Sequence, residues 1–219
     1  IAAVARHAHG VRGVRGRAPL WVLAFGLLAA GCTPIGRGGF SGTSYDSGTA
    51  SGPVQASAQE AIRTAQDILA HQPDRQIDCS HFVLACYHSA RMADYFRRQK
   101  PGENLTYYLN EYLTQARTRR AHAADIEPGD ILIFNETYDL NHDGRIDGQD
   151  VYTHTGIVES FQDWVVTYLD ASLGRHPDIQ RRRFSFYGDR YNETVARDPA
   201  TGRAIHARET FYAAYAVPP

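Results

Sequence analysis

The sequence predicts an α+β domain in which helices come first and an antiparallel sheet follows. Before residue 120, three segments place apolar residues at helical spacing, and the character of the chain changes from residue 130 onward. There, short runs of aromatic and β-branched residues alternate with turn-forming residues, which is the pattern of strands. Helices followed by strands, without an internal repeat, are typical of an α+β fold. The chain has 219 residues, 43% of them hydrophobic and 21% charged, enough for one well-buried core.

The three predicted helices cover residues 54–71, a segment that starts at Cys79, and about 103–118. Pro53 precedes the first helix, which suits the first turn of a helix. The second helix carries these residues on one side: Phe82, Val83, Cys86 and Tyr87. The predicted strands are the runs DILIF (130–134), TGIVES (155–160), WVVTYLD (164–170), RFSFYG (183–188) and TFYAAYAV (210–217).

The first 32 residues have the features of an export signal. Four arginines precede the apolar run LWVLAFGLLAA, and the first acidic residue is Asp46. This run is about half of the roughly 20 residues that a transmembrane helix needs, so we expect no permanent transmembrane anchor. The end of the run, LLAAGC, resembles the lipobox of bacterial lipoproteins, which implies that Cys32 is lipidated after cleavage. A plain secretory signal cleaved near the same place is the alternative.

Residues 33–52 are rich in Gly, Ser and Thr, a composition that buries too little apolar surface to fold. We therefore interpret them as a flexible tether between the signal and a domain that spans residues 53–219. The formal net charge of −1 gives no sign of the strongly basic face that nucleic-acid binding requires. Nucleic acid is accordingly excluded as an expected partner, and the domain is expected to be a monomer.

Cys79 is the first candidate for chemistry. Cys79 and Cys86 are seven residues apart on one predicted helix, about 10.5 Å along its axis, so they are too far apart for a disulfide. A thiol at a helix N-terminus has its pKa lowered by the helix dipole, whereas Cys86 lies deeper in the helix and is expected to be a core residue. Asp78, the expected N-cap, opposes a thiolate at Cys79, so a cationic partner is needed. His154, at the start of a predicted strand, is the best placed histidine.

Three ordered blocks resemble the NlpC-like cell-wall cysteine peptidases and the related CHAP amidases: DCSHFV (78–83), PGDILIF (128–134) and HTGIV (154–158). The resemblance covers about residues 54–219 and implies a papain-like fold, in which a helix that bears the cysteine packs on a sheet that bears the histidine. It further implies that Cys79 is the nucleophile and His154 the general base. The position that matches the third member of the triad is Asp170, whose alternative interpretation is a turn residue at the end of a strand.

The chain departs from the family pattern at two places. The Tyr-x-x-Gly-Gly stretch that commonly precedes the cysteine is absent, because that region reads AIRTAQDILAHQ. The usual Gly-Leu after the DCS block is replaced by His81 and Phe82. The backbone N–H of Cys79 is the expected oxyanion donor, with Gln76 as a second candidate. The bond that is cleaved stays open.

The segment DLNHDGRIDGQD (139–150) matches a twelve-residue calcium loop. The expected ligands are Asp139, Asn141 and Asp143 at positions 1, 3 and 5, the Arg145 carbonyl at position 7, Asp147 at position 9 and Asp150 at position 12. Gly144 at position 6 permits the sharp turn. Because predicted strands flank the segment, we expect an isolated structural calcium site rather than a paired sensor. A polar hairpin tip that binds no metal is the alternative.

Together these features predict a lipoprotein of the bacterial cell envelope, in the outer membrane and facing the periplasm, that hydrolyses an amide bond in the stem peptide of peptidoglycan. Peptidoglycan and, through the lipid anchor, the membrane are its expected partners. An N-acetylmuramoyl-L-alanine amidase with the same residues and a non-catalytic, calcium-dependent wall-binding lipoprotein are the alternatives. The run GRHPDIQRRR (174–183) is interpreted as a solvated charge run, and binding of substrate carboxylates is its alternative.

Overall fold

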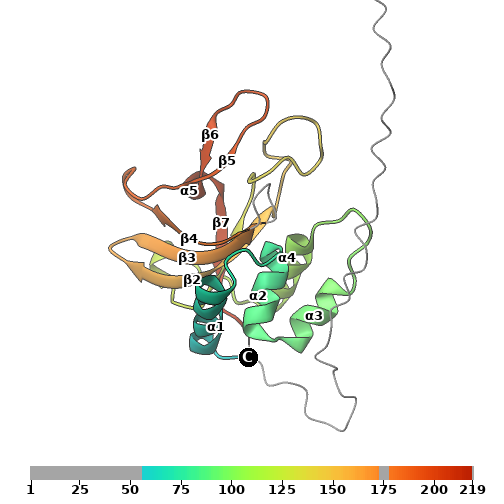
Figure 1. The fold of residues 1–219 in the computed structure, drawn as a ribbon, viewed down its shortest axis with the longest axis vertical. Helices are drawn as coiled ribbons and strands as arrows, with labels where there is room; N and C mark the ends of the chain where they lie inside the picture. Colours follow the sequence, from blue (N-terminus) through green and yellow to red (C-terminus); the bar gives the residue numbers. More distant parts are fainter. Residues whose placement is uncertain (1–55, 173–177, 219) are drawn as a thin grey trace, which may run out of the picture. The chain divides into compact units, whose positions relative to one another are not determined.

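The computed structural model describes residues 56–172 and 178–218, and these form an α+β domain (Figure 1). The predicted fold class is therefore confirmed at the level of helices packed with an antiparallel sheet. The export signal, Cys32 and the tether of residues 33–52 lie outside the described residues. Within the described ranges, no helix combines the length and the apolar character needed to cross a membrane.

The helices are α1 (Ala58–His71), α2 (Cys79–Tyr87), α3 (Ala90–Phe96), α4 (Leu105–Gln115) and the short α5 (Ala207–Thr210), with a 3-10 turn at Ala123–Asp125. Helix α1 begins later than predicted because Ser57 and Glu60 form a reciprocal capping box that fixes its first turn. Helix α2 begins at Cys79, as predicted, with Asp78 as its N-cap. Helix α3 was not predicted from the sequence.

The main sheet has the strand order β4-β3-β2-β1-β7, and all neighbours are antiparallel. Its strands are β1 (Ile131–Phe134), β2 (His154–Gln162), β3 (Val165–Ser172), β4 (Asp178–Ser185) and β7 (Phe211–Tyr215). A second sheet pairs β5 (Thr194–Arg197) with β6 (Ala204–His206). The prediction placed β4 too far along the chain, at 183–188, and did not include β5 or β6.

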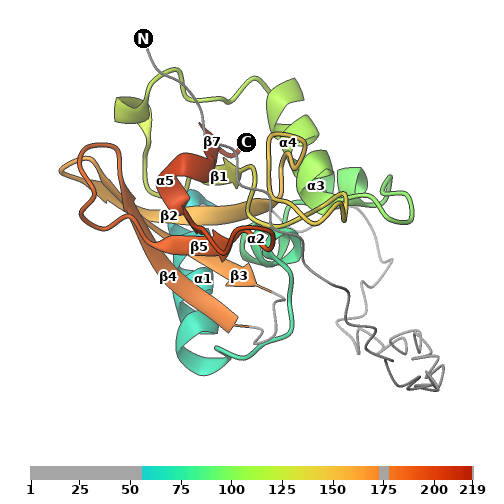
Figure 2. The same ribbon diagram turned by 90° about the horizontal axis from the view of Figure 1, so that it is seen from above.

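The strands of the main sheet point alternate side chains to its two faces, and both faces carry buried apolar residues. Each face is therefore covered by a layer of other elements. Helices α1 and α2 cover one face, whereas the β5–β6 hairpin and α5 lie over the other (Figures 1 and 2). Toward the helices, the sheet contributes Ile131, Ile133, Ile157, Leu169 and Ala171. Toward the hairpin layer, it contributes Leu132, Phe134, Val158, Tyr168 and Phe184.

The PGD segment before β1 joins the helices to the sheet. Gly129 has φ +91°, and a Cβ at this position would lie 2.3 Å from the Cβ of Ala58 in α1, so only glycine fits the turn. Its carbonyl accepts a hydrogen bond from the buried hydroxyl of Tyr87 in α2. Asp130 is 2% exposed and accepts two hydrogen bonds from Arg120, at 2.8 and 2.7 Å. The segment therefore fixes α1 and α2 against the start of β1.

Strand β2 contains one residue more than its partner β3. The pairing runs from Gly156 opposite Asp170 to Val158 opposite Tyr168 and then shifts by one residue, which leaves Glu159 as a β-bulge. The Glu159 carboxylate accepts two hydrogen bonds from Arg181, at 2.6 and 2.7 Å, and one from Gln66 of α1 at 2.7 Å. Neighbouring elements therefore hold the bulge in place on both sides.

Candidate active site

Cys79 is the first residue of α2 and lies at the helix N-terminus, as predicted. The Asp78 side chain caps the helix by accepting the backbone N–H of His81 at 2.9 Å. Cys79 and Cys86 are both free thiols. Cys86 is fully buried, and this burial raises its pKa to about 12, so it stays protonated. The two cysteines thus differ in environment as the sequence predicted.

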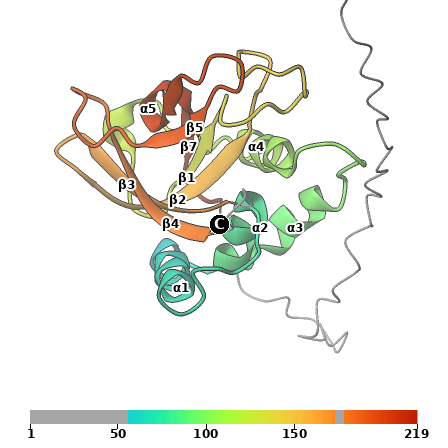
Figure 3. The same cartoon turned by 45° about the horizontal axis from the view of Figure 1, so that its top comes forward.

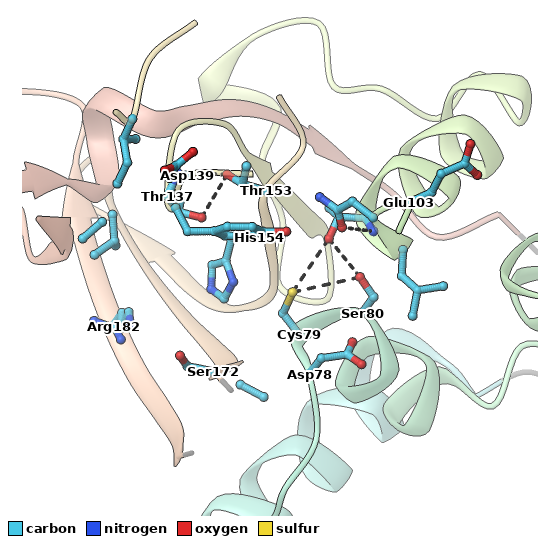
Figure 4. A pocket seen from close by; sticks show the side chains of 18 of the residues that line it. Asp78, Cys79, Ser80, Glu103, Thr137, Asp139, Thr153, His154, Ser172 and Arg182 are labelled. Carbon is cyan, nitrogen blue, oxygen red and sulfur yellow. Dashed lines mark hydrogen bonds between the residues drawn. The ribbon is translucent and has the colours of Figure 1, made fainter. Parts of the chain in front are cut away.

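His154 begins β2 and lies at the edge where the β1–β2 loop becomes sheet. Its Nε2 is 2.7 Å from Oδ2 of Asp170, which is 1% exposed on the adjacent strand β3. Because the Asp170 carboxylate accepts the proton of Nε2–H, Nδ1 is left to face the thiol. In the close-up view the His154 ring extends toward the Cys79 sulfur (Figure 4). The structure thus brings Cys79, His154 and Asp170 together.

Gly156 lets β2 and β3 approach closely enough for this contact. A Cβ at Gly156 would lie 2.8 Å from Cδ2 of Tyr168 and 2.9 Å from the carbonyl oxygen of Leu169, closer than real Cβ contacts. It would also lie 3.4 Å from the Cβ of Asp170, the residue opposite it in the sheet. The glycine of HTGIV is therefore required by the packing that sets Asp170 beside His154.

Cys79 and His154 change each other's pKa. Burial raises the pKa of the Cys79 thiol, but the charge and hydrogen bond of His154 outweigh burial, so the pKa is lowered overall. Burial lowers the pKa of His154, whereas the charge of the thiolate and the hydrogen bonds to Asp170 and Cys79 raise it to about 10. Between these two pKa values, the favoured state is a thiolate paired with an imidazolium.

Asp78 acts against this state, because its negative charge raises the pKa of Cys79. The Asp78 carboxylate is paired with Nδ1 of His81, one turn along α2. The hydrogen bond to Asp78 raises the pKa of His81, so a positive charge on His81 is favoured beside the carboxylate. His81 therefore offsets part of the unfavourable charge next to the thiol.

The sequence did not point to two hydroxyl groups that lie beside the Cys79 sulfur. Oγ1 of Thr106, in the first turn of α4, is 3.7 Å from the sulfur and 2.9 Å from Oγ of Ser80. Thr106 and Ser80 are each 1% exposed. The hydrogen bond from Thr106 lowers the pKa of Cys79. No local pattern signals Thr106, because its contact with Cys79 spans 27 residues.

Arg182 is a second residue that the sequence did not identify. It points to the same face of β4 as Asp170 does on β3, because Gln180 pairs with Asp170 and Arg182 follows two residues later. Nε of Arg182 is 3.1 Å from Oδ2 of Asp170, and Nη1 is 3.3 Å from the carbonyl oxygen of Thr194 in β5. Asp170 thus holds His154 and Arg182 with the same oxygen atom.

Within the described residues of GRHPDIQRRR, the interpretation as a solvated charge run holds for Arg181 and Arg183, whose side chains are 48% and 47% exposed, and fails for Arg182, which is 17% exposed. Residues 178–183 belong to β4, and each arginine in it has an acidic partner. The pairs are Arg181 with Glu159, Arg182 with Asp170, and Arg183 with Glu193. Side chains along a strand alternate between its two faces, so Arg182 points to the opposite face from Arg181 and Arg183. This alternation was the signal in the sequence that could have distinguished Arg182.

Cys79 and His154 open into a cleft of about 1330 Å³. The N-termini of α2 and α4 form one side, and the β1–β2 loop and the β5–β6 hairpin form the other sides. Tyr138 of the β1–β2 loop lines the cleft. Tyr138 is 42% exposed, and its partial burial together with the nearby charge of Cys79 raises its pKa to about 12, so its hydroxyl stays a hydrogen-bond donor at neutral pH. The cleft is large enough for a peptide segment.

The predicted calcium loop forms the tight turn that its glycine suggested. Gly144 has φ +88°, and Asp139 accepts the backbone N–H groups of Asp143 at 3.1 Å and Gly144 at 2.9 Å. Asp143 accepts the N–H of Arg145 at 2.9 Å. The donor set contains only oxygen atoms, which is the chemistry that calcium prefers. These residues therefore fit calcium by the type of their donors.

Asp150 is arranged differently from the other expected ligands. It is 1% exposed, and its carboxylate accepts the backbone N–H groups of Leu140 at 2.7 Å and Asp147 at 3.0 Å. Its side chain thus closes the loop from inside. Among residues 56–172 and 178–218, no three His, Cys, Asp or Glu side chains gather closely enough to hold a metal ion. The remaining loop ligands would have to converge for a cation to bind.

The loop is attached at its base and at its tip. At the base, the N–H and hydroxyl of Thr137 both bond to Oγ1 of Thr153, each at 2.9 Å, one residue before His154. At the tip, the N–H of Ile146 lies 3.4 Å from Oδ2 of Asp198, which follows β5. The loop and the β5–β6 hairpin lie side by side beyond the sheet (Figures 1 and 3).

Comparison with known proteins assigns no family to this chain. No family model matches it, and the searches of curated proteins and of solved structures find no match either.

Proposed function

We propose that this protein is a cysteine hydrolase with a papain-like arrangement that cleaves an amide bond in the stem peptide of peptidoglycan. The observation that carries the proposal is the Cys79 thiol, which lies at a helix N-terminus with its pKa lowered by His154, while His154 bonds to the buried Asp170. A structural cysteine gains nothing from such a partner, whereas a nucleophile requires one. The packing of α2 on β2 supports the papain-like assignment.

In the first half of the reaction, the Cys79 thiolate attacks the amide carbonyl carbon. The developing oxyanion is stabilised by the backbone N–H of Cys79 at the N-terminus of α2. The His154 imidazolium then gives its Nδ1 proton to the nitrogen of the leaving amine, so the C–N bond breaks and a thioester forms. Asp170 keeps the proton on Nε2 and so presents Nδ1 to the reaction.

In the second half, neutral His154 removes a proton from water, and the resulting hydroxide attacks the thioester carbonyl. The C–S bond breaks, the product leaves as a carboxylic acid, and the thiolate–imidazolium pair is restored. Thr106 supports both halves, because its hydroxyl lies 3.7 Å from the sulfur and stabilises the thiolate when it leaves. No step requires a metal ion or an organic cofactor.

The choice of peptidoglycan rests on the three sequence blocks that resemble cell-wall hydrolases and on the export signal with its tether. The cleft of about 1330 Å³ supports a peptide rather than a small metabolite as substrate. We propose that lipidated Cys32 anchors the chain in the outer membrane and that the tether gives the domain reach into the periplasm. An N-acetylmuramoyl-L-alanine amidase would use the same residues, and analysis of the products distinguishes the two.

We also propose that the β1–β2 loop binds calcium through Asp139, Asn141, Asp143, the Arg145 carbonyl, Asp147 and Asp150. The bound cation would offset the mutual repulsion of these acidic side chains and stiffen one side of the cleft. Its role is structural, since none of these residues is needed for the proton transfers above.

The decisive experiment digests purified sacculi and identifies the released muropeptides by mass. Cys79→Ala is expected to abolish release, because the variant lacks the thiolate that His154 activates. The matched control is Cys86→Ala, which removes a thiol of the same helix that stays protonated in the core. Release by Cys79→Ala at the wild-type rate would overturn the enzyme proposal. Retained binding of the variant to sacculi, without any cleavage by the wild type, would favour the wall-binding alternative.

A further inference from the structure

We propose that Arg182 is a positioning residue of the candidate site, which compensates the charge of the buried Asp170 carboxylate and so lets His154 adopt both of the protonation states that the reaction needs. This inference rests on the proposed function, because it adds a fourth member to the group of Cys79, His154 and Asp170. Arg182 acts through Asp170 and takes no part in the bond changes. In the close-up view, Arg182 and the Cys79 sulfur lie on opposite sides of the His154 ring (Figure 4).

The Asp170 carboxylate is buried and depends on two neighbouring groups. The residue is 1% exposed, and within the described ranges its Oδ1 is buried without a hydrogen-bond partner. Its Oδ2 lies 2.7 Å from Nε2 of His154 and 3.1 Å from Nε of Arg182. A buried carboxylate is strongly unfavourable unless cations or hydrogen-bond donors compensate its charge. His154 and Arg182 supply this compensation through a single oxygen atom.

The two partners of Asp170 differ in how they keep their charge during the proposed reaction. His154 is an imidazolium beside the thiolate and becomes neutral in the second half, before it removes a proton from water. Arg182 stays charged throughout, because a guanidinium is not deprotonated in proteins. When His154 is neutral, Arg182 is therefore the cation that remains beside Asp170. Without Arg182, the carboxylate would favour the imidazolium, so His154 would release its proton less readily.

Contacts with β3 and β5 fix Arg182 in this position. Gln180 is the residue opposite Asp170, and Arg182 follows it by two positions, so Arg182 and Asp170 point to the same face of the sheet. Nη1 of Arg182 donates to the Thr194 carbonyl of β5 at 3.3 Å. The side chain is 17% exposed, so water screens its charge less than that of a surface arginine.

The neighbouring arginines of β4 provide a contrast. Arg181 and Arg183 point to the opposite face, where they pair with Glu159 at 2.6 Å and with Glu193 at 3.5 Å. Their side chains are 48% and 47% exposed, and water weakens such pairs. Arg181 is the matched control for Arg182, because it is the preceding residue of the same strand and also pairs with a carboxylate.

The charge of His154 depends on groups from several elements, so a test of Arg182 has to separate it from the others. The thiolate of Cys79 is the strongest of these neighbours and can be removed by substitution. The ionisable groups on the His154 side of the cleft are Asp78 and Cys79 at the start of α2, Tyr138 and Asp139 of the β1–β2 loop, Asp170 of β3, Arg182 of β4 and Arg197 of β5.

The first test follows the charge of His154 by NMR of its ring nitrogens in the Cys79→Ala protein, in which the thiolate is absent. In Arg182→Gln, the midpoint of the titration should rise by about one pH unit or more, because the Asp170 carboxylate then has the imidazolium as its remaining cation. Arg182→Lys, which keeps the charge, and Arg181→Gln should both stay close to the parent midpoint. An unchanged midpoint in Arg182→Gln, or the same rise in Arg181→Gln, overturns the inference.

The second test reverses the sign of the effect and measures the thiol. In Asp170→Asn, the charge of Arg182 is left without its carboxylate and disfavours the imidazolium, so alkylation of Cys79 by iodoacetamide at neutral pH should become at least about tenfold slower. Adding Arg182→Gln to this variant should make alkylation about threefold or more faster again, although a further contact is lost. A purely structural role for Arg182 predicts that the double variant is no faster than Asp170→Asn.

That result overturns the inference, as does an undiminished rate in Asp170→Asn. The second test also decides the inference if Arg182→Gln alone does not fold, because the double variant contains neither an unpaired carboxylate nor an unpaired guanidinium at this position. Both measurements are independent of hydrolysis. A protein that passes them but releases no muropeptides would refute the proposed function and leave the role of Arg182 in the charge of His154 intact.

Discussion

At the scale of single residues, the reactivity of Cys79 is a balance of groups that act in opposite directions. Burial and Asp78 raise its pKa, whereas His154 and Thr106 lower it. Capping of α2 and activation of the thiol therefore conflict, because the N-cap residue, Asp78, carries a negative charge that disfavours the thiolate. Pairing of Asp78 with His81 reduces the conflict without loss of the cap.

This balance predicts the pH dependence of the proposed hydrolysis. Hydrolysis should increase as pH rises through the lowered pKa of Cys79 and decrease as His154 loses its proton near pH 10, which gives a bell-shaped profile. Alkylation of Cys79 by iodoacetamide, followed against pH, reports the first step directly. In His154→Ala the alkylation profile should move to higher pH, because burial then acts without the imidazolium. The same midpoint in both proteins would show that His154 does not activate the thiol.

Much of the central site could be predicted from the sequence, because Cys79 and His154 each lie in a short block with its own pattern. Asp170 followed from the resemblance, and the structure places it beside His154. Thr106 could not be predicted, since its contact with Cys79 forms only when folding brings α4 beside α2. For Arg182, the alternation of side chains along β4 was a signal, but it needed the correct bounds of that strand. Arg182 in particular was hidden among arginines whose side chains alternate between the faces of β4.

At the scale of elements, long periodic segments were predictable and short ones were not. The apolar patterns identified α1, α2, α4 and most strands of the main sheet. Helix α3 has seven residues, and β5 and β6 have four and three, so no burial pattern repeats in them more than about twice, which is too short to identify an element. The missing hairpin matters most, because it forms one side of the cleft.

The β1–β2 loop is the element whose behaviour should depend on calcium. Saturation at about 100 times the dissociation constant should add roughly 2.7 kcal/mol to the free energy of unfolding, which corresponds to a rise in Tm of about 5–10 °C. A chelator should reverse this rise and slow hydrolysis, because Tyr138 and Asp139 of the loop line the cleft. Asp143→Ala should behave like the chelated protein, and magnesium should restore less than calcium. The same Tm in chelator and in millimolar calcium would show that the loop is an acidic turn.

At the scale of the whole molecule, the main sheet separates two layers that meet at the candidate active site. The helical layer supplies Cys79 from α2, and the sheet supplies His154 and Asp170. The hairpin layer is tied to this pair by the bond from Arg182 to the Thr194 carbonyl. The candidate site therefore depends on the assembly of all three layers, because its groups come from separate parts of the chain.

The proposed lipid anchor gives a prediction for the complete chain. Expressed in a Gram-negative host, the protein should partition to membranes and incorporate labelled palmitate, and Cys32→Ser should prevent both. Activity of the purified variant on sacculi should persist, because Cys32 is separated from the domain by the tether. A wild-type product that is soluble and unlabelled would instead support simple secretion.

The bulge at Glu159 determines which single-residue deletions the sheet can tolerate. Loss of Glu159 would remove only the residue that β3 does not match, so Gly156 would stay opposite Asp170 and His154 would keep its partner. The loss would still cost the contacts with Arg181 and Gln66, so a lower Tm with retained hydrolysis is expected. Loss of one residue from β3 before Asp170, such as Thr167, would instead turn that carboxylate toward the helices or break the pairing. A deletion scan through both strands should find one tolerated position in β2 and none in the facing part of β3.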